Sequence, residues 1–150
     1  MRARAAILDA WFEKTIQIYP EQTRKSVSRG LEQFRNPVGF TVRESLARLL
    51  EELAGEMDAV RASEALEKLI RLRAVQDCTP AEAVCFVFLL RQIMGELGGG
   101  DQFPDFERRL DELALMAFDQ YVKCREDLAL IRINEARRAL SIRQLKRDDL

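Results

Sequence analysis

The sequence RAVQDCTPAEAVCFVFLLRQIM, residues 73–94, decides the fold class, because a strong helix-start signal leads directly into eight consecutive apolar residues, 83–90. Thr79 can cap the helix, Pro80 suits its first position, and Glu82 can reach back to the N–H of the cap residue. A helix that is apolar on all sides is typical of the centre of a bundle. We therefore predict a buried central helix that begins directly after Thr79.

Apolar residues recur at helical spacing along the chain, and no run alternates with period two for long enough to be a strand. A break is expected at 36–39, where Pro37 and Gly39 interrupt the pattern. The expected helices are one over about 3–18, one opened by Pro20, one opened by a capping box of Thr41 and Glu44, one over about 59–74, the central helix, and one over 105–140. The sequence therefore predicts an all-α bundle of about six helices.

The helical spacing also predicts which side chains form the core. The expected core-facing residues are Leu8, Trp11, Phe12, Thr15, Ile16 and Tyr19 in the first helix, Val27, Leu31 and Phe34 in the second, Val42, Leu46, Leu49, Leu50 and Leu53 in the third, and Val60, Leu66, Leu69, Ile70 and Val75 in the fourth.

The last helix is too long for the bundle. Thirty-six helical residues span about 54 Å, whereas a compact domain of this size has a radius of gyration near 15 Å. Apolar residues beyond Tyr121, among them Leu128 and Ile131, would be poorly covered on a lone monomer. We therefore expect a homodimer with Tyr121, Leu128 and Ile131 at its interface, within one domain whose core covers about 3–125 and whose C-terminal extension covers 126–150.

Composition excludes several classes of function. The chain has no histidine, which excludes haem held by a proximal histidine, zinc sites that need histidine and catalytic triads that use imidazole as the base. Its 24 Lys and Arg against 25 Asp and Glu give a net charge of −1 and no overall attraction to nucleic acid. No apolar run approaches the roughly 20 residues of a membrane span. We expect a cytoplasmic protein that is not an enzyme, needs no cofactor or metal and neither binds nucleic acid nor inserts into a membrane.

Five residues are candidates for a small-ligand site. Arg73, Gln76 and Asp77 precede the central helix, where helix N–H groups can receive an anion. Phe88 and Arg91 lie within that helix and could hold an apolar body and an anionic group. Ion pairs and ordinary loop hydrogen bonds remain open alternatives for the charged residues. Cys78, next to the helix cap, is either a redox-sensitive thiol or an inert small side chain.

Two stretches carry a resemblance to a known family: RNPVGFTVRESLARLLEEL, residues 35–53, and RLRAVQDCTPAEAVCFVFLLRQI, residues 71–93. Over about residues 8–125 the chain resembles the N-terminal domain of RsbRD-type proteins, the RsbT co-antagonists of bacterial stress signalling. The resemblance implies a globin-like helical sensing or docking module without required haem, usually dimeric, that feeds a downstream output domain. Because no output domain follows up to Leu150, we expect the last helix to contact a separate signalling protein or to complete a dimer.

The expected function is therefore that of a non-enzymatic regulatory or sensory module in bacterial signal transduction, which acts through protein–protein contacts of a dimer and its long C-terminal helix. The alternative is a sensor domain that binds a small ligand in an apolar helical pocket with an arginine-lined polar corner.

Overall fold

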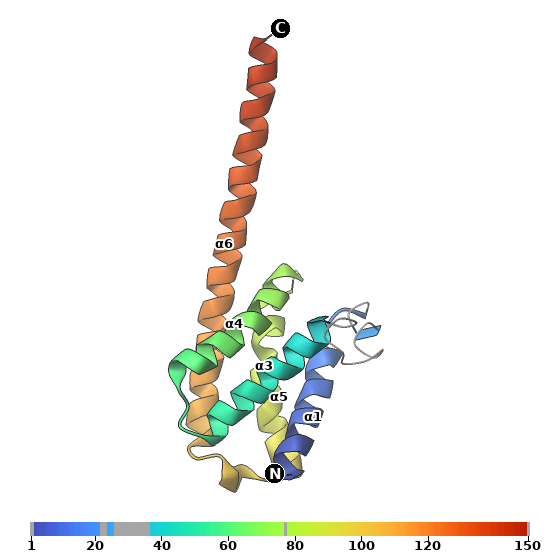
Figure 1. Cartoon of the computed structure of the whole chain (residues 1–150), viewed down its shortest axis with the longest axis vertical. Helices are drawn as coiled ribbons and strands as arrows, with labels where there is room; N and C mark the ends of the chain where they lie inside the picture. The colour runs from blue at the N-terminus through green and yellow to red at the C-terminus, as the bar shows by residue number, and fades with distance from the viewer. Residues whose placement is uncertain (1, 22–23, 26–36, 77, 150) are drawn as a thin grey trace.

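The computed structural model describes residues 2–21, 24–25, 37–76 and 78–149, whose helices carry the labels of Figure 1. The α-helices and the one-turn 3₁₀ helix η1 are α1 (Arg2–Gln17), α3 (Pro37–Ala54), α4 (Ala59–Val75), α5 (Pro80–Leu97), η1 (Gly100–Gln102) and α6 (Phe106–Asp148). The described part contains no strand, so the all-α prediction is confirmed. The expected core residues Val27, Leu31 and Phe34 lie outside the described residues.

The central helix α5 begins as its sequence predicts. The Thr79 hydroxyl accepts a hydrogen bond of 3.2 Å from the Glu82 N–H, and the Glu82 carboxylate accepts one of 3.1 Å from the Thr79 N–H. The helix ends at Gly98, whose φ of 73° is unstrained for a residue without Cβ. α5 packs against both α1 and α6, and its core-facing residues are Ala83, Phe86, Val87, Leu90, Ile93 and Met94.

The predicted core is largely confirmed, with two errors in α4. Trp11, Leu46 and Leu66 are fully buried, together with Ile7, which the spacing did not single out. Val60 and Val75, expected inside, are instead 67% and 73% exposed. At about 100° per residue they lie 120° and 180° around the α4 axis from Leu66, on the side that faces solvent.

Helix α3 begins at Pro37, four residues before the predicted start at Thr41. Proline is compatible with the first helical turn, because the N–H that it lacks has no acceptor within the helix. Gly39, expected in a loop, is buried within the first turn. Thr41 and Glu44 therefore lie inside the helix and do not form the predicted capping box at its start.

The first half of α6 is part of the bundle. Arg109 donates a hydrogen bond of 3.0 Å to the carbonyl of Leu53 at the end of α3, and Arg125 donates one of 3.1 Å to that of Ala74 at the end of α4. Both arginines satisfy helix-terminal carbonyl groups that have no N–H donor within their own helices. Leu110, Leu113 and Ala117 complete this side of the core.

The second half of α6 extends beyond the bundle as a single helix, as Figure 1 shows. Every described residue from Ala129 to Asp149 is exposed. We call residues 129–148 the distal segment; at 1.5 Å per residue it is about 30 Å long. The helix runs further than the predicted 105–140, and Lys146 and Arg147 in its last turn suit the negative end of the helix dipole. The predicted overhang is thus confirmed.

Candidate functional site

An apolar stripe runs along the solvent side of α6, and we call it the outer stripe. Its large residues, Leu115, Phe118, Val122, Ile133 and Leu140, are between 38% and 68% exposed. Ala129 and Ala136 fill positions between them, and Glu126 is the only charged residue in the series 115, 118, 122, 126, 129, 133, 136, 140. Steps of three and four residues keep this series on one side of a helix. The stripe therefore begins where α6 packs on the bundle and continues along the same side of the helix into the distal segment.

A second apolar line, the inner seam, continues the core-facing side of α6 past the end of the bundle. It consists of Cys124, Leu128, Ile131, Ile142 and Leu145, with Glu135 and Arg138 between its two halves. At about 100° per residue, the outer stripe lies roughly 165° around the helix axis from this line. One packed helix therefore cannot cover both surfaces.

The structure places the three residues predicted for an interface at different depths. Tyr121 is 3% exposed, and its hydroxyl donates a hydrogen bond of 2.6 Å to the carbonyl of Cys78, so it is covered within its own subunit. Leu128 is half-buried against the core, while Ile131 is 53% exposed. Leu128 and Ile131 join Val75 in a groove of about 280 Å³ between α4 and α6. Their interface role stays a prediction.

Arg91 is occupied by ion pairs. Its Nε lies 2.7 Å from the Glu107 carboxylate and its Nη2 lies 2.8 Å from the Asp111 carboxylate, both on α6. Hydrogen bonds to Asp111 and then Glu107 raise the pKa of the Arg91 guanidinium above its ordinary value. The guanidinium also lies 5.8 Å from the ring centre of Phe88, which is 46% exposed. Arg91 and Phe88 thus lie on the outer surface of the α5–α6 pair, and Arg91 links the two helices.

Arg73 is buried, with a 3% exposed side chain. Its Nη1 donates a hydrogen bond of 2.9 Å to the Gln76 amide oxygen, its Nη2 donates one of 3.4 Å to the Glu82 carbonyl, and its guanidinium lies 4.5 Å from the ring centre of Tyr19. Its Nε has no hydrogen-bond partner among the described residues. Burial raises the pKa of Tyr19 to about 12, against the opposing effect of the Arg73 charge. Asp77, the third residue of the predicted corner, lies outside the described residues.

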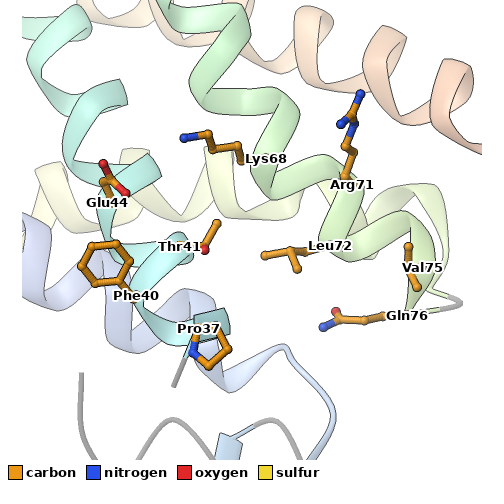
Figure 2. Close-up of a pocket in the computed structure, with 9 residues that line it drawn as sticks. All are labelled: Pro37, Phe40, Thr41, Glu44, Lys68, Arg71, Leu72, Val75 and Gln76. Atoms are coloured by element: carbon orange, nitrogen blue, oxygen red, sulfur yellow. The ribbon is translucent and has the colours of Figure 1, made fainter. Parts of the chain in front are cut away.

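Gln76 faces a groove of about 670 Å³ between α3 and α4. Figure 2 shows Pro37, Phe40, Thr41 and Glu44 on the α3 side, and Lys68, Arg71, Leu72, Val75 and Gln76 on the α4 side. The lining is mainly apolar and includes the charged Lys68, Arg71 and Glu44, and the Arg71 guanidinium also pairs with the Glu67 carboxylate at 2.6 Å. Such a lining suits a molecule with an apolar body and an anionic group. The structure thus brings Gln76 together with Lys68 and Arg71, while Arg91 and Phe88 lie on a different surface.

The three cysteines are free thiols. Cys78 donates a hydrogen bond of 3.1 Å from Sγ to the carbonyl of Arg73. Burial raises the pKa of Cys85 and of Cys124 above the ordinary value of a thiol. A raised pKa lowers the thiolate fraction at neutral pH, which makes these two thiols poor nucleophiles.

No described helix combines the length and apolar character needed to cross a lipid bilayer. Within the same residues, no group of three or more cysteine and carboxylate side chains is arranged to hold a metal ion.

The model of the RsbT co-antagonist protein RsbRD N-terminal domain matches residues 5–136, which is most of the 150-residue chain. The chain belongs to this family. No match was found among curated proteins or among solved structures. RsbRD N-terminal domains are regulatory and sensory domains rather than enzymes, and they fit the stress-response pathway. The match extends beyond both ends of the resemblance at 8–125 and includes the first part of the distal segment.

The outer stripe of this RsbRD N-terminal domain was not predicted from sequence. A signal for it exists, because positions 115, 118, 122, 129, 133, 136 and 140 are apolar at helical spacing. The same helix carries a second apolar side, which the bundle buries at Leu110, Leu113 and Ala117. The pattern by itself therefore indicated two apolar sides but not which of them stays exposed.

Proposed function

We propose that this RsbRD N-terminal domain is a non-enzymatic regulatory or sensory module of bacterial stress signalling that acts through protein–protein contacts of α6. In this proposal the chain forms a homodimer in the cytoplasm, and a separate signalling protein contacts the long helix. A haem-free globin-like arrangement of the helices belongs to the same proposal, on the family resemblance alone.

One observation carries this proposal. The distal segment holds the exposed apolar residues Leu130, Ile131, Ile133, Leu140, Ile142 and Leu145 on a helix that extends away from the described part of its own bundle. Removing apolar surface from water is favourable by about 25 cal/mol per Å². Lone helices are also marginal in water, because most helix stability in proteins comes from packing. Association stabilises this segment in both respects.

The groove beside the inner seam supports contact with a separate protein. Val75, Leu128 and Ile131 line it together with the charged Arg71 and Asp127. An amphipathic helix can place an apolar side chain in such a groove and meet the charges with its polar side. The groove lies where the bundle ends and the distal segment begins, so a bound helix would contact both.

Light scattering tests the dimer. The wild-type chain should have the mass of a dimer at micromolar concentration, and the triple variant Ile131→Asp, Ile133→Asp, Leu140→Asp should have that of a monomer. All three residues lie in exposed positions, so the bundle should keep its helical content by circular dichroism. The matched control carries Asp at Glu135, Arg137 and Ser141, which leaves the apolar residues in place. A monomeric wild type would refute the dimer.

A pull-down from native extract tests the separate partner. The wild-type chain should retain a signalling protein that the variant Ile131→Asp retains poorly, because Ile131 lines the groove. The matched variant Ile133→Asp changes a neighbouring isoleucine outside the groove and should retain it. Equal retention by both variants would remove the groove from the proposal.

A second candidate function is favoured by the groove of Figure 2, which combines an apolar lining with Lys68, Arg71 and Gln76. A small molecule bound there would make the domain a ligand sensor. Binding to the native state raises the melting temperature by mass action. A thermal-shift screen of carboxylate metabolites with apolar bodies should then give hits that Lys68→Ala and Leu72→Asn abolish and that Lys14→Ala, far from the groove, leaves intact. A screen without hits would count against this function.

A further inference from the structure

Three large apolar residues are exposed on the α5–α6 side of the bundle, Phe88 of α5 with Leu115 and Phe118 of α6, and we call them the patch. Arg91 joins Glu107 and Asp111, so this level of α5 lies beside this level of α6. The two helices run in opposite directions (Figure 1), and Phe88 precedes Arg91 by one turn while Leu115 follows Asp111 by one turn. Phe88 and Leu115 therefore occupy one outer face, at 46% and 68% exposure.

This patch and the apolar residues of the distal stripe lie along one side of α6, with the charged Glu126 between them. From Leu115 the outer stripe passes through Phe118 and Val122 to Ile133 and Leu140, always on the same side of α6. Large exposed apolar surfaces on soluble proteins mark interaction sites. A partner that covers the whole surface must extend along residues 115–140 of α6 and also cover Phe88 of α5.

We infer that a second copy of this chain covers the outer stripe, with the two α6 helices parallel and in register around a two-fold axis. This inference rests on the dimer of the proposed function and names the surface that forms it. In this arrangement the two-fold axis runs along the paired helices, so each large residue of the stripe meets its own counterpart. Phe88 and Leu115 of one bundle then face those of the other.

The small residues of the stripe suit this pairing. Ala129 and Ala136 alternate with Ile133 and Leu140 at the three- and four-residue steps of a coiled coil. Alanine at every second position lets two helices approach closely, and the larger side chains fill the space between these layers. The distal segments would therefore form a two-stranded coiled coil that extends from the paired bundles.

An antiparallel pair covers less of the surface. With Ile133 opposite the partner's Ala136 and Ala129 opposite the partner's Leu140, the distal segments would pair, but the two bundles would lie at opposite ends. Phe88, Leu115 and Phe118 would then stay exposed. Only the parallel arrangement covers the patch and the distal stripe together, so the geometry favours it.

Glu126 distinguishes the two arrangements by the sign of its effect. In the parallel pair it faces the partner's Glu126, and like charges at facing positions weaken association. In the antiparallel pair it faces the partner's Arg143, and the contact is attractive. The variant Glu126→Gln should therefore lower the dimer dissociation constant, measured by sedimentation equilibrium at low salt. A raised dissociation constant would overturn the parallel arrangement.

Matched double variants test which surface pairs. Ile133→Glu with Leu140→Glu changes the outer stripe, and Ile131→Glu with Ile142→Glu changes the inner seam at equally exposed positions of the same segment. The first pair should raise the dimer dissociation constant more than tenfold, and the second should change it less than threefold. The opposite order would place the dimer on the inner seam and refute the inference, while leaving the dimer itself intact.

Disulfide formation tests register. In a chain with Cys78, Cys85 and Cys124 replaced by alanine, Ala129→Cys should oxidise to a covalent dimer, because parallel in-register helices bring the two sulfur atoms together. In the antiparallel pair, the two introduced thiols would be about 16 Å apart along the axis. Ala139→Cys, on the inner side of α6, is the control and should stay reduced. A monomeric wild type would refute the proposed dimer, whereas a dimer in which the Ala129→Cys variant forms no disulfide would refute only this inference.

Discussion

The indole Nε1 of Trp11 donates a hydrogen bond of 2.7 Å to the carbonyl oxygen of Phe86, and the two rings stack with centroids 6.4 Å apart. Both residues are buried, and the contact joins α1 to the central helix across 75 positions of sequence. It satisfies the single polar group of the largest core side chain. Trp11 therefore fixes the position of α1 on α5.

Trp11→Ala should lower the free energy of unfolding by about 3–5 kcal/mol, because it removes a fully buried ring and leaves a cavity. Trp11→Phe keeps most of the packing and loses the hydrogen bond, so its cost should be about 1–2 kcal/mol. Urea unfolding followed by circular dichroism, at one protein concentration for all variants, measures both. If both variants lower the free energy of unfolding equally, the hydrogen bond rather than the packing of the ring accounts for the stabilisation by Trp11.

Arg91→Gln should lower the free energy of unfolding by no more than about 1 kcal/mol, since both of its ion pairs are at the surface and screened by water. The loss should shrink further in 1 M salt, where the Debye length is about 3 Å. Urea unfolding at low and high salt measures this dependence, with Arg48→Gln as a control that breaks a single pair with Glu44. If Arg91→Gln lowers the free energy of unfolding by much more than about 1 kcal/mol and salt does not reduce this effect, the link between α5 and α6 is not purely electrostatic.

The melting temperature should fall as pH rises from about 10 toward 12, because Tyr19 resists ionisation in the folded chain. Its pKa is about 12 in the folded chain against an ordinary value of 10.0, so between these pH values the unfolded chain loses the phenolic proton first. Stability from this group is thus fully present below pH 10 and lost above it. Calorimetry at a series of pH values measures the fall, which Tyr19→Phe should reduce. An unchanged slope in that variant would assign the effect to other groups.

Cys85 and Cys124 should react slowly with iodoacetamide at pH 8, because burial raises their pKa and keeps them as thiols. In a Cys78→Ala chain, the rate per thiol should be several-fold below that of glutathione and should still be rising above pH 9. Mass spectrometry of the labelled peptides separates the two sites. Labelling as fast as that of glutathione would contradict the raised pKa values.

Local signals in the sequence determined the parts of the fold that depend on a few neighbouring residues. The start of α5 follows from Thr79, Pro80 and Glu82, which interact within one turn and need no other part of the chain. The overhang of α6 follows from its length alone. At α3 the same reasoning was wrong by one turn, because Pro37 is as compatible with a first helical turn as with a loop.

Tertiary packing decided which surfaces remain open. Between Ala83 and Leu90 every residue is apolar, so no periodicity could indicate that Phe86 is buried and Phe88 exposed. α6 carries two apolar sides, and only the positions of α4 and α5 determine that Leu113 is covered while Leu115 is not. The partners of Arg91, 16 and 20 residues away, likewise depend on how two helices meet. Helix formation is encoded within a few residues, whereas the choice of buried face depends on contacts between distant segments, and that choice positions the surface from which we infer the dimer.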